Sequence, residues 1–189
     1  MYKVISLKKP DFKNTSQADL LEIWFDKITT NIKKPIIYKI RTSPNFETIK
    51  KCAYVDVDIK TPKLTIEKIK KTNPKIKIII SYHNFKKTPE IKELKNIYKK
   101  MKRQNADIVK FAAHANSITD SFKMLEFLSS LTQKGQKAIC LCMGEKGLLT
   151  RISGHLFGNY LMYFSKDGKN KTAPGQITIS EFKKFNHES

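Results

Sequence analysis

Short runs of apolar residues, separated by polar segments, recur along the whole chain and predict eight strands. Each run is five to seven residues long, which suits a strand and is far too short to span a membrane. Within several runs apolar and polar residues alternate, as in "YVDVDI". Other runs are apolar at every position, as in "AICLCM". The predicted strands occupy residues 2–7, 20–26, 35–40, 54–59, 76–82, 107–113, 138–143 and 160–164.

Two amphipathic helices are predicted in the second half of the chain. Thr88 has the character of an N-cap, Pro89 suits a first helical position, and apolar residues follow at helical spacing through 91–101. A second helix covers 122–131 and is closed by Gly135. Strands that alternate with helices indicate parallel βα units, and eight of them predict an α/β fold of the (β/α)8 TIM-barrel type.

The first half of the chain is short for such a barrel. About a dozen residues join the first two predicted strands, and "TSPNFETIKKCA" joins the third to the fourth. The 189 residues lie below the roughly 200–250 of an ordinary barrel, so we expect a single compact domain over 1–189 with reduced early crossover helices. An open doubly wound sheet is the alternative fold, but no glycine-rich dinucleotide loop follows any strand.

The composition and the distribution of charge limit the kinds of molecule that this chain is expected to bind. The net charge of +20 invites a nucleic-acid interpretation, yet the lysines are spread along the chain and only three of the 37 basic residues are arginines. No basic segment is interleaved with stacking aromatics, so we expect no nucleic-acid partner, although the positive field would attract an anionic substrate.

The N-terminal sequence and the cysteines indicate the cellular compartment and the state of the thiols. "MYKVISLKKPD" has no basic segment followed by a signal-type apolar stretch, so we expect a cytoplasmic protein without a membrane partner. The chain has three cysteines, an odd number, and no C-x-x-C motif. We therefore expect the cysteines to be reduced core residues that form neither a disulfide framework nor a metal site.

Polar residues gather at the predicted strand ends, where a barrel of this type carries its chemistry. Because side chains alternate across a strand, Asp56 and Asp58 should share one face, as should Glu22, Trp24 and Asp26. Any one of these residues alone fits a satisfied polar group at a loop entrance. The strand-end set that should converge on one mouth comprises Glu22, Asp26, Arg41, Asp56, Asp58, His83, Lys110 and Met143.

Lys110 stands out because it interrupts the apolar run of "NADIVKFAAHAN". One interpretation is a lysine whose stem packs while its ammonium reaches water. The other is an amine kept so poorly solvated that its pKa falls from about 10.4 to ~7–8, which leaves a neutral nucleophile able to form an imine with a ketone. His83 ends the preceding strand with inward parity, and its imidazole could take and return a proton beside such an imine.

Four ordered motifs resemble one family. "ISYHNFKKTPE", "NADIVKFAA", "MGEKGLLTRISGHLFG" and "TAPGQI" are similar to those of type I 3-dehydroquinate dehydratase, a shikimate-pathway lyase with a (β/α)8 barrel and usually a homodimer. The resemblance is ordered from about residue 52 to 180 and patchier before that. It implies dehydration of 3-dehydroquinate to 3-dehydroshikimate without a metal or other cofactor.

The resemblance also implies residue roles. Lys110 would form the Schiff base with the substrate ketone, and His83 would remove the proton next to the imine carbon and protonate the departing hydroxyl. Arg151 would clamp the substrate carboxylate, and Thr172 and Gln176 would belong to a lid loop. The remaining implied contacts with the ring or the mouth are those of Glu22, Arg41, Asp56 and Met143. Two of the three arginines, Arg41 and Arg151, thus fall at matched positions, where a lysine could not reproduce a bidentate grip.

The sequence also departs from the family pattern. Trp24 stands where the family usually has an arginine, and the glutamate that normally orients the catalytic histidine has only Asn45 or Glu47 as nearby counterparts. These departures leave two alternatives open: an inactive barrel of the same family, and another Schiff-base enzyme such as a class I aldolase.

Overall fold

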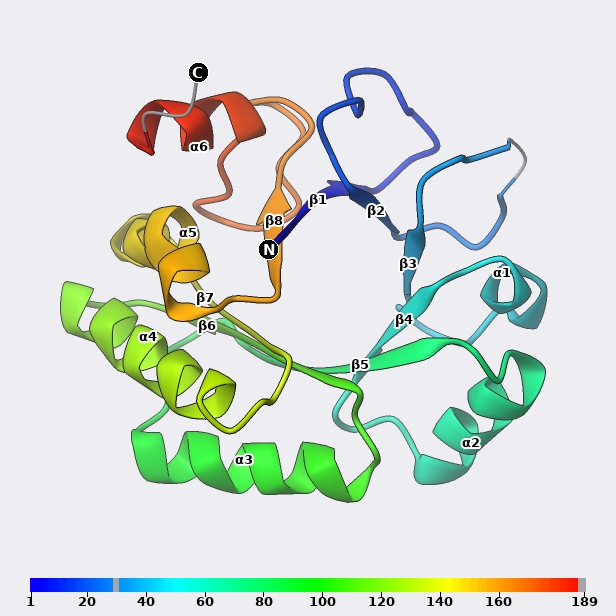
Figure 1. Cartoon of the computed structure of the whole chain (residues 1–189), viewed down its shortest axis with the longest axis horizontal. Coiled ribbons are helices and arrows are strands. Elements are labelled where there is room, and N and C mark those ends of the chain that lie inside the picture. Colours follow the sequence, from blue (N-terminus) through cyan, green and yellow to red (C-terminus); the bar gives the residue numbers. More distant parts are fainter. Residues whose placement is uncertain (29–30, 187–189) are drawn as a thin grey trace.

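Eight parallel strands form a nearly closed barrel in the computed structural model, which describes residues 1–28 and 31–186 (Figure 1). From β1 to β7 each strand pairs with the next strand in sequence, and β8 pairs with β1, so the sheet order is β7-β6-β5-β4-β3-β2-β1-β8. Between β7 and β8, Tyr160 N–H donates to the Ala138 carbonyl at 2.8 Å. The strands are β1 (Tyr2–Leu7), β2 (Leu20–Ile23), β3 (Ile36–Lys39), β4 (Tyr54–Asp58), β5 (Lys77–Asn84), β6 (Ile108–His114), β7 (Ala138–Met143) and β8 (Leu161–Phe164).

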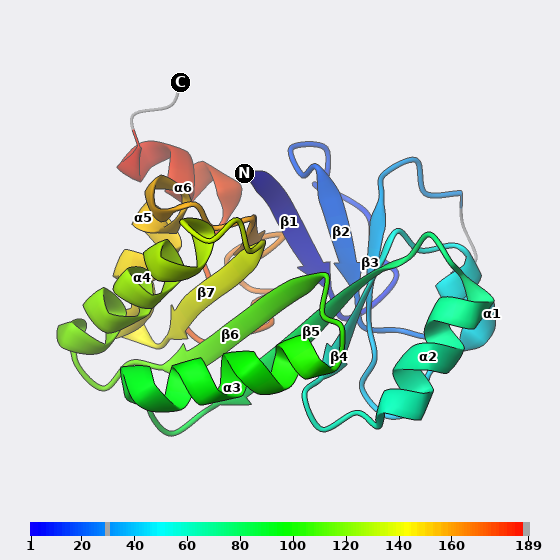
Figure 2. The same ribbon diagram turned by 60° about the horizontal axis from the view of Figure 1, so that its bottom comes forward.

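Helices cover the barrel unevenly. Those that follow β4 to β7 pack along the outside of the sheet, whereas the described residues between β1 and β2 and between β2 and β3 form no helix (Figures 1 and 2). The α-helices are α1 (Phe46–Lys50), α2 (Lys63–Thr72), α3 (Ile91–Arg103), α4 (Ile118–Thr132), α5 (Leu148–Ser153) and α6 (Ile179–Phe185), with 3-10 turns η1 (Glu145–Gly147) and η2 (Gly154–Phe157). The reduced early crossovers predicted from the sequence are therefore confirmed, and α1 is little more than one turn.

Two helix details differ from the prediction. Helix α3 has Glu90 as its N-cap residue and not Thr88, whose hydroxyl instead donates to the His114 carbonyl at 2.9 Å. Thr88 is thus used to tie the β5–α3 loop to the end of β6. Helix α4 begins at Ile118, earlier than its apolar spacing indicated, because Ser117 and Asp120 form a capping box. Gly135 follows α4 with φ +71°, which fits its predicted role in ending the helix.

Side-chain alternation divides the core into layers. One apolar cluster inside the barrel includes Leu20, Ile37, Ile79, Ile108 and Ile139. A larger cluster lies between the sheet and α1–α4, and a third packs β1, β2 and β8 against α6. The three cysteines are free and lie in the core, as predicted, and Cys140 and Cys142 belong to the cluster between the sheet and the outer helices. Within the described ranges, no helix is long and apolar enough to cross a membrane.

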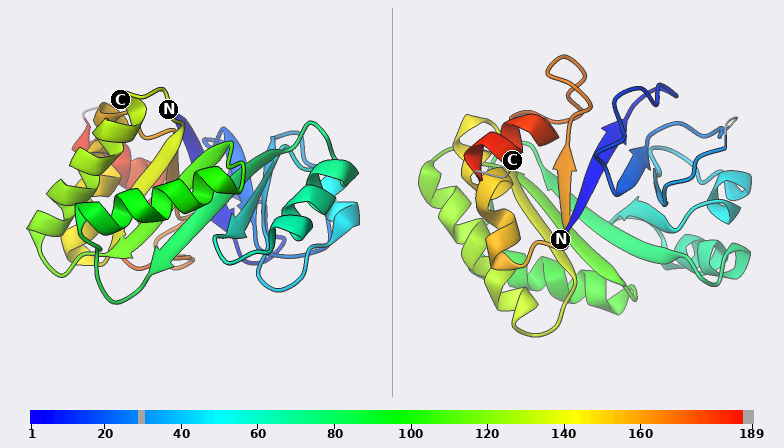
Figure 3. Two further views of the ribbon diagram at one scale, coloured as in Figure 1. Left: turned by 90° about the horizontal axis from the view of Figure 1, so that it is seen from below. Right: turned by 45° about the horizontal axis from the view of Figure 1, so that its top comes forward.

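The loop between β8 and α6 extends beyond the carboxyl end of the barrel (Figure 3, right). It returns to the sheet where Ser165 pairs with Thr178. The segment 172–176 in this loop lies against the loop after β7, where Gly144 N–H donates to the Pro174 carbonyl at 3.4 Å. The loop thus brings residues distant in sequence over the mouth of the barrel.

Candidate active site

A layer of polar side chains crosses the barrel above its apolar interior. Strand register places it there: Lys39 pairs with Asp56 across β3 and β4, and Ser81 pairs with Lys110 across β5 and β6. Glu22 lies opposite Ile37 in the β2–β3 register. All of these polar side chains have the parity of the inner apolar residues, so alternation alone turns them toward the barrel axis.

Lys110 lies at the centre of this layer and is 5% exposed. Its ammonium nitrogen donates to Asp56 Oδ2 at 2.8 Å and to Glu22 Oε1 at 3.1 Å, and it lies 3.9 Å from the centroid of the Tyr163 ring. The two carboxylates are contributed by β4 and β2, so contacts across the barrel hold the nitrogen. A fully desolvated cation is stable in this position because it has two anionic partners.

These contacts correct the prediction of a neutral Lys110. Burial alone would lower the pKa of the Lys110 amine, but the charges of Asp56 and Glu22 outweigh burial and hold that pKa well above its ordinary value. Lys110 is therefore an ammonium in the resting site. Although burial opposes it, the charges of Lys110 and Lys39 lower the pKa of the Asp56 carboxyl, which keeps it ionised at neutral pH.

His83 lies on β5, the strand next to β6, and lines the same small cavity as Lys110. Burial and the positive charges of Lys39 and Lys110 lower the pKa of His83 to about 4, against opposing contributions from Asp56 and Asp58. The imidazole is therefore neutral at physiological pH. Its ring stacks on Phe85 with 6.2 Å between the ring centroids.

Two cavity residues come from β2 and its end. The Trp24 indole N–H donates to Glu22 Oε2 at 2.7 Å, so Trp24 fixes the carboxylate that reaches Lys110. The Arg41 guanidinium lies over this indole, 4.8 Å from the ring centroid. Glu22 and Trp24 line the cavity, whereas the exposed Arg41 is not among the lining residues.

Arg151 lies in α5 and reaches the cavity from the side, with 4% of its surface exposed. Its guanidinium donates to the Pro174 carbonyl at 3.1 Å, while its Nε has no hydrogen-bond partner among the residues that the structure describes. Within residues 1–28 and 31–186, no carboxylate pairs with Arg151, and burial lowers its pKa to about 10. A buried, unpaired guanidinium facing a cavity is poised to accept an anionic ligand group.

The segment 172–176 covers the cavity. Gln176 Oε1 accepts from the Thr172 backbone N–H at 2.8 Å and from its hydroxyl at 3.0 Å, which closes the segment into a compact turn. Met143, at the end of β7, forms part of the opposite wall. The cavity is about 80 Å³, and its lining includes Ser6, Ala112, Leu141, Met143, Tyr163, Thr172, Ala173 and Gln176.

The expectation that Asp26 shares a face with Glu22 is wrong, and the two nearby counterparts of the family's glutamate have other partners. Asp26 does not share the face of Glu22, because β2 ends at Ile23 and the Asp26 carboxylate accepts from the Tyr38 hydroxyl. Asn45 does not orient His83, since its side chain caps α1 by accepting from Thr48 N–H at 3.0 Å. Glu47 does not do so either, as it pairs with Lys50 on the surface.

Sequence reasoning missed Lys39 and Ser6. Lys39 donates to Asp56 Oδ1 at 2.7 Å and to Ser81 Oγ at 2.9 Å. The Asp56 carboxylate therefore accepts from both Lys39 and Lys110. Its inward parity with Ile37 was the available signal, and it was obscured by the abundance of lysine. Ser6 is 2% exposed, and its hydroxyl has no hydrogen-bond partner in the described part of the chain.

The fold and these groups define a class: a parallel TIM barrel with a buried, ion-paired lysine and a neutral histidine at its carboxyl-end mouth. Within the described ranges, no group of three acidic, histidine or cysteine side chains could hold a metal ion. The model of the type I 3-dehydroquinase family matches residues 11–188, and this chain belongs to that family.

Curated relatives carry the same family name. A 3-dehydroquinate dehydratase from Methanococcus maripaludis strain C5 is 37% identical over 89% of this chain and 84% of the relative. The enzyme of that name from Desulfotalea psychrophila is 33% identical over 69% of this chain. In that match, as in the one with the strain C7 relative, the chain covers only 59% of the relative's length.

Solved structures of 3-dehydroquinate dehydratases share the fold. The Geobacillus kaustophilus enzyme superposes with a TM-score of 0.83 at 20% identity, covering 97% of this chain and 89% of the other. A type I enzyme from Clostridium difficile with covalently modified comenic acid gives a TM-score of 0.79 at 20% identity, covering 98% and 90%. At this identity the likeness establishes the barrel alone, and confirms the predicted fold.

Proposed function

We propose that this chain converts 3-dehydroquinate to 3-dehydroshikimate through a Schiff base on Lys110, with His83 as the general acid and base. The observation that carries the proposal is that one covered cavity contains both a buried lysine held by two carboxylates and a buried arginine that has no anionic partner among the described residues. The lysine is placed for a ketone, and the arginine for the carboxylate of the same molecule. Membership of the dehydroquinase family supports this choice of substrate.

The carboxylates explain why a charged lysine suits this chemistry. The ammonium must first give up a proton, and we assign Glu22 as the acceptor because Asp56 is also held by Lys39. The free amine then attacks the ketone carbon to give a carbinolamine, and Glu22 returns its proton to the carbinolamine hydroxyl, which leaves as water. The product is a protonated imine beside an ionised Glu22. That imine carries the same positive charge as the resting ammonium, so Asp56 and Glu22 stabilise the electron sink that the next step needs.

His83 performs the proton transfers of elimination. As a neutral imidazole it removes the proton next to the imine carbon, and the electron pair moves into the iminium to give an enamine. The imidazolium then protonates the departing hydroxyl, which leaves as water while the enamine electrons restore the imine. Hydrolysis of that imine frees the product and Lys110. Thr172, Gln176 and Met143 enclose the ring and exclude solvent during these steps.

Arg151→Lys tests the carboxylate clamp. A lysine retains the charge but cannot provide a bidentate grip, so we expect KM for dehydroquinate to rise roughly tenfold to a hundredfold, with a smaller change in kcat. Steady-state kinetics measures both constants. Arg103→Lys, which alters an exposed arginine at the end of α3, is the matched control and should change neither. An unchanged KM in Arg151→Lys would refute the clamp.

Lys39→Met tests whether the second lysine keeps His83 neutral. Removing its positive charge should raise the pKa of His83 toward its ordinary value, so the acid limb of kcat/KM should move from near pH 4 to higher pH. The pH–rate profile measures this shift. Lys39→Arg preserves the charge and should keep the limb near its original position. A limb that stays in place in Lys39→Met would exclude this role.

The function itself is tested with purified protein and two measurements. Ultraviolet absorbance of the conjugated product should appear with dehydroquinate, and borohydride added during turnover should leave a mass adduct on a peptide containing Lys110. An inactive barrel would give neither signal. An aldolase would trap a different ketone and fail to dehydrate dehydroquinate, so either result would overturn the proposal.

A further inference from the structure

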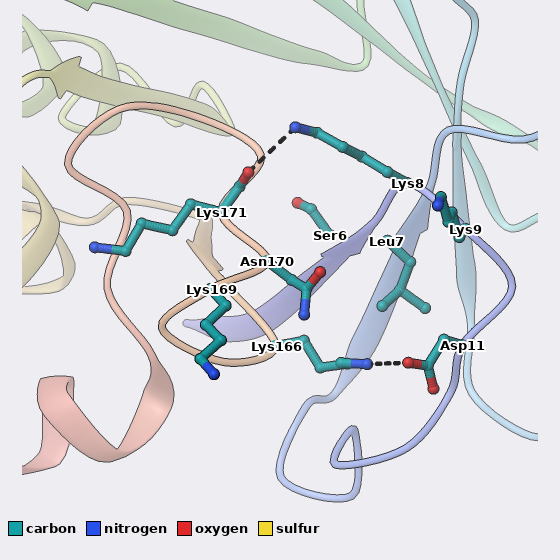
Figure 4. A pocket seen from close by; sticks show the side chains of 9 residues that line it. All are labelled: Ser6, Leu7, Lys8, Lys9, Asp11, Lys166, Lys169, Asn170 and Lys171. Atoms are coloured by element: carbon teal, nitrogen blue, oxygen red, sulfur yellow. Dashed lines mark hydrogen bonds and ion pairs between the residues drawn. The ribbon is translucent and has the colours of Figure 1, made fainter.

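A second cavity lies beside the candidate active site, between the loop after β1 and the loop after β8 (Figure 4). Its volume is about 240 Å³, larger than that of the covered cavity. The residues that line it are Ser6, Leu7, Lys8, Lys9, Asp11, Lys166, Lys169, Asn170 and Lys171. None of the roles assigned above uses the lysines of this cavity.

The cavity has a large excess of positive charge. Five of its nine lining residues are lysines, and its one acidic residue, Asp11, is paired with Lys166. The Lys166 side chain is only 8% exposed, so it is a built part of the wall. In Figure 4 the side chain of Lys171 turns away from the cavity, and its carbonyl accepts from Lys8 at 3.2 Å. Lys8, Lys9 and Lys169 therefore remain without a carboxylate partner among the described residues.

We propose that this cavity binds a compact, multiply charged oxyanion of the phosphate or pyrophosphate type. Several lysines around one concave site need a counter-charge greater than Asp11 supplies, and phosphoryl oxygens can accept hydrogen bonds from several ammonium groups at once. The lining residues include no aromatic side chain on which a base could stack, which favours one or two phosphoryl groups over a whole nucleotide.

The anion would bridge two loops and hold the cover of the neighbouring cavity. Lys8 belongs to the loop after β1, while Lys166 and Lys169 belong to the loop that continues directly into Thr172 and the covering segment 172–176. The buried Ser6 lines both cavities and forms their common wall. An anion between the loops would favour the arrangement in which 172–176 lies over the mouth, because that arrangement places both sets of lysines around it.

Trp24 supplies a built-in reporter. It is the single tryptophan of the chain and lines the candidate active site, and the Lys8 ammonium lies 5.8 Å from the centroid of its ring. Drawing Lys8 toward an anion changes the charge near the indole. We therefore expect pyrophosphate to alter tryptophan emission saturably, without any substrate present.

The test is titration calorimetry with pyrophosphate at about 150 mM salt, where long-range attraction by the net charge is screened beyond roughly 8 Å. We expect one saturable site per chain, and at least about tenfold weaker binding in Lys8→Gln/Lys169→Gln. The matched control is Lys95→Gln/Lys99→Gln, which removes the same charge from the exposed face of α3 and should bind like the parent. Equal weakening in both variants, or no saturation, would overturn the site.

Further measurements identify which type of phosphate compound binds and test whether its binding is coupled to the neighbouring cavity. Inorganic phosphate should compete with pyrophosphate, whereas ATP binding more tightly than pyrophosphate would overturn the preference for a compact anion. Fluorescence of Trp24 should respond in the parent and in the Lys95/Lys99 control but not in the Lys8/Lys169 variant, and a parent without a response would exclude coupling to the neighbouring cavity. None of these arms requires turnover, so a failure of the dehydratase proposal would not be mistaken for a failure of the anion site.

Discussion

Replacing Lys110 with methionine is expected to lower kcat/KM for dehydroquinate by roughly 10⁴- to 10⁶-fold, the scale observed when a covalent nucleophile and its partners stop acting as a unit. Methionine has a similar length but no amine, so the ketone cannot form an imine and the electron sink for proton removal is lost. The product-absorbance assay measures the rate. Mass spectrometry after borohydride treatment should find no adduct.

Two controls separate chemistry from folding. Lys110→Arg retains a cation between Asp56 and Glu22 but is not nucleophilic at neutral pH, so it should be as inactive as Lys110→Met while better preserving stability. Lys95→Met, on the exposed face of α3, should keep full activity. Turnover within about tenfold of the parent in Lys110→Met would refute the imine mechanism.

The same variant should also be less stable, because removing one partner of a buried ion pair leaves an uncompensated charge. The expected cost is about 3–5 kcal/mol in the free energy of unfolding at pH 7. In the parent, Lys110 and Lys39 lower the pKa of Asp56, so the stabilisation is present above the unfolded value near 3.9 and is lost as pH falls through the folded pKa. The stability difference between parent and variant should therefore shrink below about pH 4, which urea unfolding at several pH values can measure.

The polar layer was predictable from the sequence because it depends on local rules. Strand parity identified Glu22, Asp56, His83 and Lys110 as inward-facing, and parallel strands bring their carboxyl ends to one mouth. The same rule failed for Asp26, since parity has no meaning beyond the last strand residue, Ile23. Fold class was likewise readable from the alternation of strands and helices, including the reduced early crossovers.

The charge state of Lys110 was not predictable because its partners lie across the barrel. Glu22 on β2 and Asp56 on β4 are distant in sequence from β6, and alternation says which face they share without saying which atoms meet. The apolar neighbours of Lys110 in sequence suggested a neutral amine, whereas its neighbours in space are two carboxylates. Lys39 was overlooked for a related reason, since its importance comes from its bond to Asp56 and not from any local pattern. The homodimer and the cytoplasmic location involve more than this one chain and stay predictions.

Arg151 illustrates how the two kinds of reasoning support each other. Its rarity as an arginine in a lysine-rich chain suggested a geometric requirement, and the structure shows a buried guanidinium with an unsatisfied Nε beside the cavity. The same sequence argument applied to Arg41 receives no such support, because Arg41 lies exposed over the Trp24 ring and does not line the cavity. Trp24 stands where the family usually has an arginine, and its indole N–H donates to Glu22. In this chain the residue at that position therefore fixes a carboxylate that is paired with Lys110.

Replacing His83 with glutamine should separate imine formation from elimination. Glutamine retains hydrogen-bonding groups but cannot take up a proton, so we expect kcat to fall roughly 10²- to 10⁴-fold, the usual contribution of a positioned acid–base group. Lys110 and its carboxylates are untouched, so borohydride should still trap an adduct, now mostly of the undehydrated substrate. The mass of that adduct distinguishes the two species by one water. His155→Gln, which alters a histidine packed on Phe182 outside the cavity, is the control for the chemical change.

The pH dependence gives the same experiment a second readout. Burial and the charges of Lys39 and Lys110 lower the pKa of His83 to about 4, so the basic form of the imidazole is present above that pH and is lost below it. The parent's acid limb in kcat/KM should therefore lie near pH 4, well below the ordinary histidine range, and it should be absent from the residual activity of His83→Gln. If the variant kept the limb, another group would be the base. If it lost adduct formation as well as elimination, His83 would be needed to deprotonate Lys110, and the assignment of that step to Glu22 would be wrong.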